Sequence, residues 1–325
     1  MATILITGGA GYIGSHTCKL LASVGHLPVA FDNLSNGHAD AVRWGPLQTG
    51  DICDRRQLRA AFEAWRPESV IHFAGLIEVG RSTADPATFY RANVAGSLAL
   101  LEEMAAVGLR RIVFSSSAAV YGIPVSSPIP EEAPPAPVSP YGETKRAVEA
   151  MLDAFARACG INYAALRYFN AAGADPEGEL GERHDPETHL IPRALRTALG
   201  LEPELVIFGT DYPTPDATAV RDYVHVSDLA AAHVAALDRL ASGGGPLTTN
   251  IGTGSGRSVQ QVLESCRRIS GCRIPARTAP RRAGDPPELV AATGRAARDL
   301  GWRPHLSDLD SIIATAWAWH SARGA

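Results

Sequence analysis

The chain has 325 residues, of which 46% are apolar and 20% are charged, and its formal net charge is −4 at pH 7. A mean hydropathy of −0.02 is typical of a globular enzyme and excludes a disordered or fibrous chain. The acidic balance argues against nucleic acid and anionic membrane surfaces as partners. Because single cores stop growing at roughly 250 to 300 residues, we expect one large and one smaller domain.

The five cysteines are scattered and form no C-x-x-C pair, so the sequence predicts neither a disulfide framework nor a metal site. The amino terminus has no basic region, and its apolar run stops at a glycine turn, which favours a first strand over a signal peptide. No apolar run reaches the roughly 18 residues of a membrane span. We therefore expect a cytoplasmic protein with no membrane partner.

The first half of the chain alternates strands with helices, in the order expected of a parallel sheet covered on both faces. The strands are apolar almost throughout, which is typical of strands buried on both sides. Strands are predicted at 3–7, 28–32, 47–51, 69–74 and 111–116, and helices at 12–24, 54–65 and 85–106. The fold class is therefore α/β, with a doubly wound parallel (Rossmann-type) sheet.

Residues 124–140 contain seven prolines, which exclude a regular helix or central strand and favour a long loop beside a cleft over an interdomain linker. A helix from Tyr141 and a strand at 162–169 continue the sheet. Beyond Asn170, loops rich in glycine, proline and acidic residues separate short elements, which indicates a second, smaller mixed α/β domain. The large domain is predicted to hold 1–172 and about 217–252, and the smaller one about 173–216 and 253–325.

A glycine loop, "LITGGAGYIG", follows the first strand and opens a helix, which is the context of a phosphate-binding loop. Such a loop needs a tight turn, a backbone that touches a pyrophosphate, and helix N–H groups that point at the anion. An ordinary glycine turn is the alternative. The glycines fit either of two spacings, and the candidate cofactor contacts here are Gly8, Gly11, Tyr12, Ile13 and Gly14.

Asp32 closes the second strand about twenty residues after this loop, where a carboxylate accepts hydrogen bonds from an adenosine ribose. The segment "FDNLSNG" contains no arginine for a 2′-phosphate, so NAD is favoured over NADP, with Asn33 beside the ribose. Asp51 and Ile52 end the third strand and are candidates for the adenine. Alternatively, Asp51 is solvated and Asp54 caps the next helix.

Tyr141 and Lys145 stand four residues apart, so on a helix they share one face. An ammonium about 4 Å from a phenol lowers the pKa of the phenol by roughly three units, which makes the tyrosine a usable base near pH 7. Two side chains on a helix surface are the alternative. The serine run "FSSSAAVYG" at the carboxyl end of the preceding strand favours the catalytic interpretation, because open α/β sheets bind ligands there.

Several motifs occur in an order that resembles the extended short-chain dehydrogenase/reductase family, and within it the UDP-glucose 4-epimerases. They are "TGGAGYIG", "HFAGL", "FSSSAAVYG", "SPYGETK", "LRYFNAAGA" and "VRDYVHVSDLA". The resemblance runs from Ile4 to the last helix. It implies an isomerase that uses NAD to invert C4 of a UDP-hexose, in which the large domain binds NAD and the smaller domain binds the UDP-sugar.

The resemblance implies a role for each matching position. Tyr141 would be the general base, Lys145 its electrostatic partner and Ser117 a hydrogen-bond partner of the substrate. The further cofactor contacts would be Phe73, Ala74, Gly75, Asn93, Ser115 and Tyr168. The substrate contacts would be Asn170, His189, Leu190, Phe208, Arg221, Tyr223, Arg282, Asp285 and Leu289. For Arg221, a surface pair with Asp222 is the alternative.

Two positions depart from the family pattern or leave it open. Ile77 stands where many epimerases carry a lysine near the cofactor phosphates, which puts tight NAD retention in doubt. Leu289 stands where the family has either a bulky aromatic or a small residue, so N-acetylated sugars stay undecided. A 4-epimerase of another UDP-sugar and a non-catalytic NAD sensor are the alternatives to this function.

The alanine-rich segments 85–106 and 141–159 are predicted to form a homodimer contact. Burial of these segments inside one subunit is the alternative.

Overall fold

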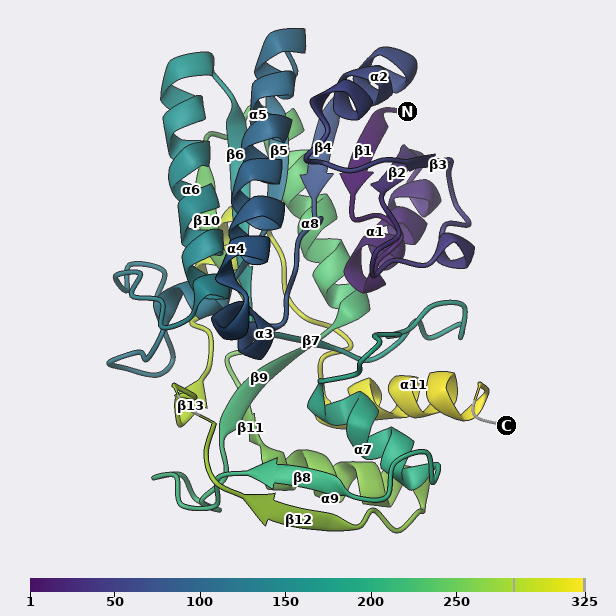
Figure 1. Cartoon of the computed structure of the whole chain (residues 1–325), viewed down its shortest axis with the longest axis vertical. Helices are drawn as coiled ribbons and strands as arrows, with labels where there is room; N and C mark the ends of the chain where they lie inside the picture. The colour runs from purple at the N-terminus through teal and green to yellow at the C-terminus, as the bar shows by residue number, and fades with distance from the viewer. Residues whose placement is uncertain (283, 324–325) are drawn as a thin grey trace.

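The computed structural model describes residues 1–282 and 284–323, and its larger part is built on a parallel sheet of seven strands (Figure 1). The strand order is β10-β6-β5-β4-β1-β2-β3, and every neighbouring pair is parallel. This order confirms the predicted doubly wound sheet. The strands are β1 (Thr3–Thr7), β2 (Leu27–Asp32), β3 (Leu47–Thr49), β4 (Ser69–His72), β5 (Arg111–Ser117), β6 (Asn162–Tyr168) and β10 (Leu247–Ile251).

Helices cover both faces of this sheet, because alternate residues of its strands point to opposite sides. Ile4 and Ile6 of β1 belong to one core cluster, which also holds residues of α1 (Tyr12–Ser23) and α8 (Val226–Ala241). Leu5 belongs to the other cluster. The helices packed there are α2 (Arg55–Trp65), α5 (Gly96–Val107) and α6 (Pro140–Cys159).

The single helix predicted at 85–106 is wrong in detail, because the chain forms three helical segments there. They are α4 (Pro86–Phe89), a π-helical segment η2 (Tyr90–Ala95) and α5, and they follow an unpredicted short helix, α3 (Val79–Ala84). A π-helical segment widens the turn and is frequent at functional sites. Here it carries Asn93, whose side chain holds the loop after β4.

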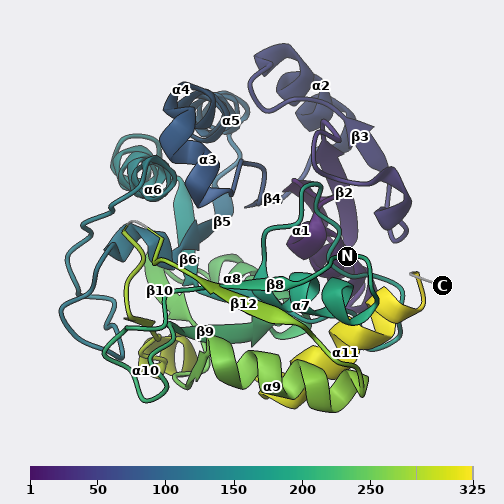
Figure 2. The same cartoon turned by 60° about the horizontal axis from the view of Figure 1, so that its bottom comes forward.

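The smaller part of the molecule lies at the carboxyl ends of the large sheet, toward which β1 and β4 point in Figure 1. It contains a four-stranded sheet and a two-stranded parallel pair, packed with three helices, as seen from below in Figure 2. The strands are β7 (Asn170–Ala172), β9 (Val220–His225), β11 (Gly256–Ser258), β13 (Glu288–Leu289), β8 (Leu205–Phe208) and β12 (Ala276–Ala279). The helices are α7 (Leu190–Ala198), α9 (Val259–Ser270) and α11 (Leu309–Ser321).

Three short helices, η1 (Ala39–Ala41), η3 (Ala118–Tyr121) and α10 (Gly294–Asp299), complete the described elements. The predicted boundary near residue 217 falls just before β9, which pairs within the smaller sheet, whereas α8 and β10 belong to the large one. The domain division therefore stays a prediction, and residues 283 and 324–325 lie outside the described residues. Among the helices that the structure describes, none is both long and apolar enough to span a bilayer.

Candidate active site

The glycine loop packs so closely that side chains would not fit at positions such as Gly8 and Gly14. Gly8 has a φ of 73°, and a Cβ built there would lie 2.7 Å from the backbone nitrogen of Ala74. A Cβ on Gly14 would overlap the carbonyl oxygen of Gly8. Gly11 precedes α1 without a side-chain cap, so the first N–H groups of this helix face the loop without a side-chain acceptor. This arrangement fits a bound pyrophosphate.

Asp32 ends β2 beside the loop, and its carboxylate is held by main-chain N–H groups. Ala10 donates to it at 3.0 Å and Leu34 at 2.8 Å. Burial raises the pKa of Asp32, although these two hydrogen bonds oppose the shift. The built Cβ of Gly37 would lie 3.0 Å from both carboxylate oxygens, so a glycine leaves the approach to this carboxylate open.

Asp51 and Asn33 lie next to each other at the ends of β3 and β2. Asn33 donates to Asp51 at 3.0 Å, and the backbone N–H of Cys53 donates at 2.8 Å. Burial tends to raise the pKa of Asp51, but these hydrogen bonds outweigh it and the pKa is lowered. Asp54 caps α2 through the N–H groups of its first turn, so the capping alternative is confirmed, and an adenine contact of Asp51 stays a prediction. Ile52 is buried in the core.

The loop after β4 lies between the glycine loop and α6. The N–H of Ala74 donates to Thr7 at 3.0 Å, and a Cβ on Gly75 would meet the Asn93 side chain. The buried Asn93 binds both main-chain groups of Leu76, and it donates to Thr144 of α6 at 3.0 Å. Phe73 packs against the core cluster that contains Ile4 and Ile6 of β1. These contacts, with the glycine loop and Asp32, make a site whose residues fit NAD.

Tyr141 stands in the first turn of α6, directly after the predicted proline-rich loop. Ser139 caps the helix by accepting the N–H of Gly142 at 3.2 Å, and the N–H of Tyr141 donates to Ser82 of α3 at 3.1 Å. The side chain is 8% exposed. Its hydroxyl faces that of Ser117, the last residue of β5, which the serine run predicted.

The predicted lowering of the Tyr141 pKa is wrong for this structure. Burial raises the pKa of the phenol, and the Ser117 hydroxyl only reduces the increase. Lys145 is also buried, and this lowers the pKa of its ammonium to about 8, while the charge of Glu149 opposes the shift. The spacing gave the proximity of the two groups, but it contained no information on how deeply they are buried.

Lys145 faces both Tyr141 and the serine strand, which is β5 with the serine run at its carboxyl end. Its Nζ donates to the main-chain oxygen of Ser115 at 2.8 Å and lies 5.8 Å from the centre of the Tyr141 ring. The Ser115 hydroxyl shares a hydrogen bond with the hydroxyl of Tyr168, which ends β6. The structure thus brings Tyr141, Lys145, both serines and Tyr168 together at the carboxyl ends of β5 and β6.

Sequence reasoning missed a buried ion pair directly behind these groups. Glu149 of α6 receives hydrogen bonds from Arg167 at 2.9 and 2.6 Å and from the Ser116 hydroxyl at 2.6 Å. The signal was present, because Glu149 stands four residues after Lys145 and Arg167 interrupts an otherwise apolar strand.

The predicted substrate residues lie in the smaller part of the molecule. Arg221 of β9 forms an ion pair with Asp285 and not with Asp222, so the surface-pair alternative is wrong. The Asp222 carboxylate instead accepts main-chain N–H groups such as that of Gly254, at 3.0 Å. The guanidinium of Arg282 stacks on the ring of Phe208, with its Cζ 4.2 Å from the ring centre.

Other predicted substrate residues are placed through the pairing of β9. Asn170 of β7 stands opposite Tyr223, which is buried, and Leu289 of β13 stands opposite Arg221. Leu289 also packs against the small core cluster that contains Ala118, the residue after Ser117. This places Leu289 beside the end of β5, and its role in a sugar pocket stays a prediction. Ile77 is exposed.

His189 precedes α7 and is bound to a buried carboxylate, which the sequence did not predict. Its Nδ1 contacts Glu182, and the Nδ1 of His184 lies 3.1 Å from the same carboxylate. Burial opposes their protonation, but the carboxylates raise the pKa of both imidazoles. Leu190 packs into the core of the smaller part. The ring of Tyr12 meets that of His184 edge-on, with centres 6.4 Å apart, so this cluster adjoins the glycine loop.

Two clusters in the described part of the chain have side-chain atoms close enough to share a metal ion. In the first, the donor atoms of Glu182, His184, Glu187 and His189 lie within 4.8 Å of one another. They already form ion pairs with each other. In the second, an acidic group around Asp175, the ammonium of Lys19 lies at 2.7 to 2.8 Å from three carboxylates.

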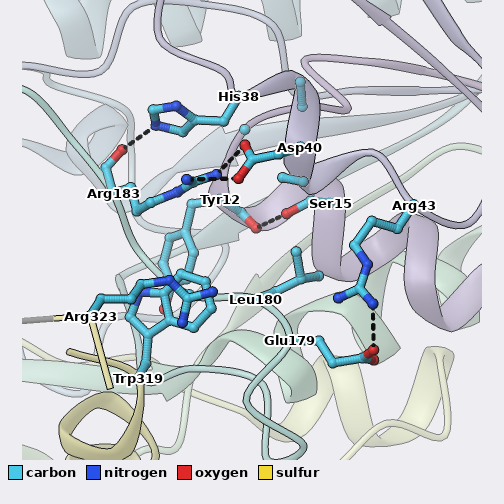
Figure 3. A pocket seen from close by; sticks show the side chains of 14 residues that line it. Tyr12, Ser15, His38, Asp40, Arg43, Glu179, Leu180, Arg183, Trp319 and Arg323 are labelled. Carbon is cyan, nitrogen blue, oxygen red and sulfur yellow. Dashed lines mark hydrogen bonds and ion pairs between the residues drawn. The ribbon is translucent and has the colours of Figure 1, made fainter. Parts of the chain in front are cut away.

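A pocket of about 270 Å³ lies on the other side of the glycine loop, next to Tyr12 (Figure 3). Two of its arginines are paired with carboxylates, Arg183 with Asp40 and Arg43 with Glu179, and the third, Arg323, lies over the ring of Trp319. Tyr141 and the serines of β5 are not among the residues that line the pocket. We therefore place the reaction at the strand ends and not in this pocket.

Comparison with known proteins agrees with this geometry. The model of the NAD dependent epimerase/dehydratase family matches residues 4–252. A protein of Rhizobium meliloti (strain 1021) named UDP-glucose 4-epimerase is 49% identical over 98% of this chain and 97% of its own length.

Solved structures of similar proteins cover the chain almost completely. The UDP-glucose 4-epimerase of Brucella ovis, in complex with NAD, is 50% identical, with a TM-score of 0.96 and 98% of both chains covered. The enzyme of the same name from Bifidobacterium longum, in complex with NAD+ and UDP, is 36% identical, with a TM-score of 0.94 and the same coverage. Since the family model spans well over half of the sequence, this chain belongs to the NAD dependent epimerase/dehydratase family.

Proposed function

We propose that this chain interconverts UDP-glucose and UDP-galactose by inverting C4 of the hexose, with NAD as its cofactor. The observation that carries the proposal is the meeting of Tyr141, Lys145 and Ser117 at the carboxyl ends of the parallel strands, next to the loop that fits NAD. Relatives named UDP-glucose 4-epimerase, similar over nearly the whole chain, support the choice of this reaction within the family.

In this proposal the side chains at the strand ends move one proton. Tyr141 takes the proton of the sugar 4-hydroxyl as C4 is oxidised and returns it when C4 is reduced. Ser117 holds the same oxygen, and the ammonium of Lys145 stabilises the phenolate. NAD, when bound, supplies reversible hydride acceptance at C4. The 4-keto sugar must present its other face before reduction, so the chain must hold the hexose loosely.

Binding energy then has to come from the UDP end of the substrate. Arg221 and Arg282 are the cations for the diphosphate, because guanidinium groups make strong charge-assisted bonds to phosphate oxygens. The structure holds both beside the ligand residues predicted with them, Asp285 and Phe208. We infer that the diphosphate competes with Asp285 for Arg221, and that the Phe208 ring neighbours the uracil.

A panel of UDP-sugars tests this function directly. The purified protein is incubated with UDP-glucose, UDP-galactose and the N-acetylhexosamine, uronate and pentose analogues, with and without added NAD, and the products are separated by chromatography. We expect UDP-glucose and UDP-galactose to interconvert. Exchange with another UDP-sugar alone would transfer the assignment to that sugar, and the N-acetyl result decides what Leu289 admits. NAD binding without any exchange would indicate the sensor.

We also propose a homodimer joined through α5 and α6. Both helices bury one side in the subunit, as the rival prediction required, but they also expose apolar residues. Leu98 of α5 is 37% exposed and Tyr90 of η2 is 43% exposed, while α6 exposes Ala150 and Ala154. Small side chains allow close helix contact. Light scattering at micromolar concentration should give twice the monomer mass, and a monomer would contradict the proposal.

A further inference from the structure

Glu149 occupies a central position behind the residues proposed to move the proton. It lies one turn after Lys145 on the same face of α6, and it is almost fully buried. A buried carboxylate is expected to be paired, and this one accepts three hydrogen bonds from two different strands. The contacts join α6 to β5 through Ser116 and to β6 through Arg167.

These contacts fix the elements on which the catalytic groups stand. Ser116 separates Ser115, which accepts the hydrogen bond of Lys145, from Ser117, which faces the hydroxyl of Tyr141. Arg167 immediately precedes Tyr168 in β6. A shift of α6 relative to either strand would therefore change the distances between the tyrosine, the lysine and both serines. One carboxylate restrains all of them.

The side chain of Arg167 is itself held in place, so it gives the Glu149 carboxylate a fixed partner. The guanidinium of Arg167 donates to the hydroxyl of Tyr121 at 3.0 Å and lies over its ring, with the Cζ 4.9 Å from the ring centre. Tyr121 in turn donates to Asn250 of β10 at 2.7 Å. The pair is thus anchored to a third strand of the sheet.

Glu149 also acts on the charge of Lys145. The ionisable groups that face this ammonium are Tyr141 and Glu149 of α6, His72 of β4 and, beyond the carboxylate, Arg167 of β6. Burial lowers the pKa of His72 to about 3, so this imidazole is neutral. Glu149 is therefore the one anion among these groups, and it opposes the loss of the lysine proton.

We propose that Glu149 is a positioning residue of this reaction: it holds α6 against β5 and β6 and sustains the ammonium of Lys145 beside Tyr141. The inference rests on the proposed function, since the reaction is what it positions. Glu149 acts through Lys145 and the serine strand, and it does not contact the reacting atoms itself. Its negative charge is the essential property, and its volume alone would not suffice.

The test compares Glu149→Gln with a matched control, Glu103→Gln. Glu103 of α5 is likewise a buried carboxylate on a helix, paired with Arg55 at 2.7 Å and Arg59 at 2.9 Å, and it lies outside the proposed site. Both variants keep the shape of the side chain and remove one charge. For each, kcat and KM for UDP-galactose are measured from pH 6 to 10, with melting temperature and bound NAD.

Both variants are expected to melt at lower temperature, but only Glu149→Gln should alter the pH profile. We expect its kcat to fall at least tenfold at pH 8 with little change in KM. The decline of kcat at high pH should move about two units lower, because a unit charge at i+4 acts over about 6 Å, which is about 3 kcal/mol at an effective dielectric constant near 20. If Glu149→Gln does not fold, a double variant with Arg167→Gln leaves no unpaired buried charge and should show a smaller shift of the same sign.

Two different failures can be told apart. If the wild type converts no UDP-sugar, the proposed function is wrong. If the wild type is active and the pH profile of Glu149→Gln, or of the double variant, matches that of Glu103→Gln, the positioning role is wrong. Glu149→Asp keeps the charge, so recovery of the wild-type decline at high pH in this variant supports the proposal, and an unrecovered decline contradicts it.

Discussion

Replacing Tyr141 with phenylalanine removes one hydroxyl group from the site and leaves the ring in place. The side chain is 8% exposed, and its hydroxyl faces that of Ser117, which accepts the N–H of Ala119 at 3.1 Å. The folded state therefore loses at most one hydrogen bond, about 0.5 to 1.5 kcal/mol. We expect a small change in melting temperature and unchanged binding of NAD and UDP.

The effect on turnover should be far larger. General acid–base catalysis contributes about 10² to 10⁴ in rate, which corresponds to about 3 to 5 kcal/mol of activation free energy. The field of Lys145 agrees with this range: at 5.8 Å, with an effective dielectric constant near 20, an ammonium stabilises a phenolate by about 3 kcal/mol. Phenylalanine loses this stabilisation because it forms no anion.

The assay follows conversion of UDP-galactose to UDP-glucose by chromatography, together with bound NAD and UDP affinity by calorimetry. Tyr163→Phe is the matched control, because its hydroxyl is bonded to Asp153 at the opposite end of β6 from Tyr168. We expect the control to retain turnover and Tyr141→Phe to lose at least a hundredfold in kcat. A Tyr141→Phe enzyme within tenfold of the wild type would refute Tyr141 as the proton acceptor.

Three further outcomes follow from the structure. Turnover of the wild type should fall as the pH rises through about 8, since burial lowers the pKa of Lys145 to about 8 and the ammonium is needed; a constant rate up to pH 10 would contradict this. Gly14→Ala should lower the unfolding free energy by about 1 to 3 kcal/mol and release NAD, because the new Cβ overlaps the loop backbone, whereas Gly294→Ala, with open space around it, should do neither. Glu182→Gln should destabilise the protein most between pH 4.5 and 6.5 in denaturant titrations. The lowered pKa of Glu182 gives stability that is lost in acid, and the raised pKa of His184 gives stability that is lost in base. An equal effect of this substitution at every pH would refute that pairing.

The sequence predicted the large sheet well because its signals are local. The strand expected at 111–116 is Arg111–Ser117, and the helix expected at 54–65 is Arg55–Trp65, with Asp54 as its cap. Continuous apolar runs, a capping aspartate and glycine turns each act within a few residues. The glycine loop was equally predictable, since the spacing of its glycines indicates where the backbone turns.

The remaining features depend on contacts between distant segments. The π-helical segment Tyr90–Ala95 has the apolar pattern of an ordinary helix, so the sequence pattern does not predict its wider turn. The stretch 220–225 forms β9 because Asn170–Ala172 and Gly256–Ser258 pair with it. The pairing of Arg221 with Asp285, 64 residues away, follows from the same sheet.

The proton acceptor shows most clearly why spacing does not determine chemistry. The i, i+4 relation of Tyr141 and Lys145 fixed their proximity, but burial, which the spacing does not encode, acts on both groups. It raises the pKa of the phenol and lowers that of the ammonium, so it drives each toward its uncharged form. A tyrosine and a lysine alone would therefore be driven toward their uncharged forms in a buried site. The carboxylate one turn further along α6 opposes this for the lysine, so the functional unit is the tyrosine, the lysine and Glu149 together.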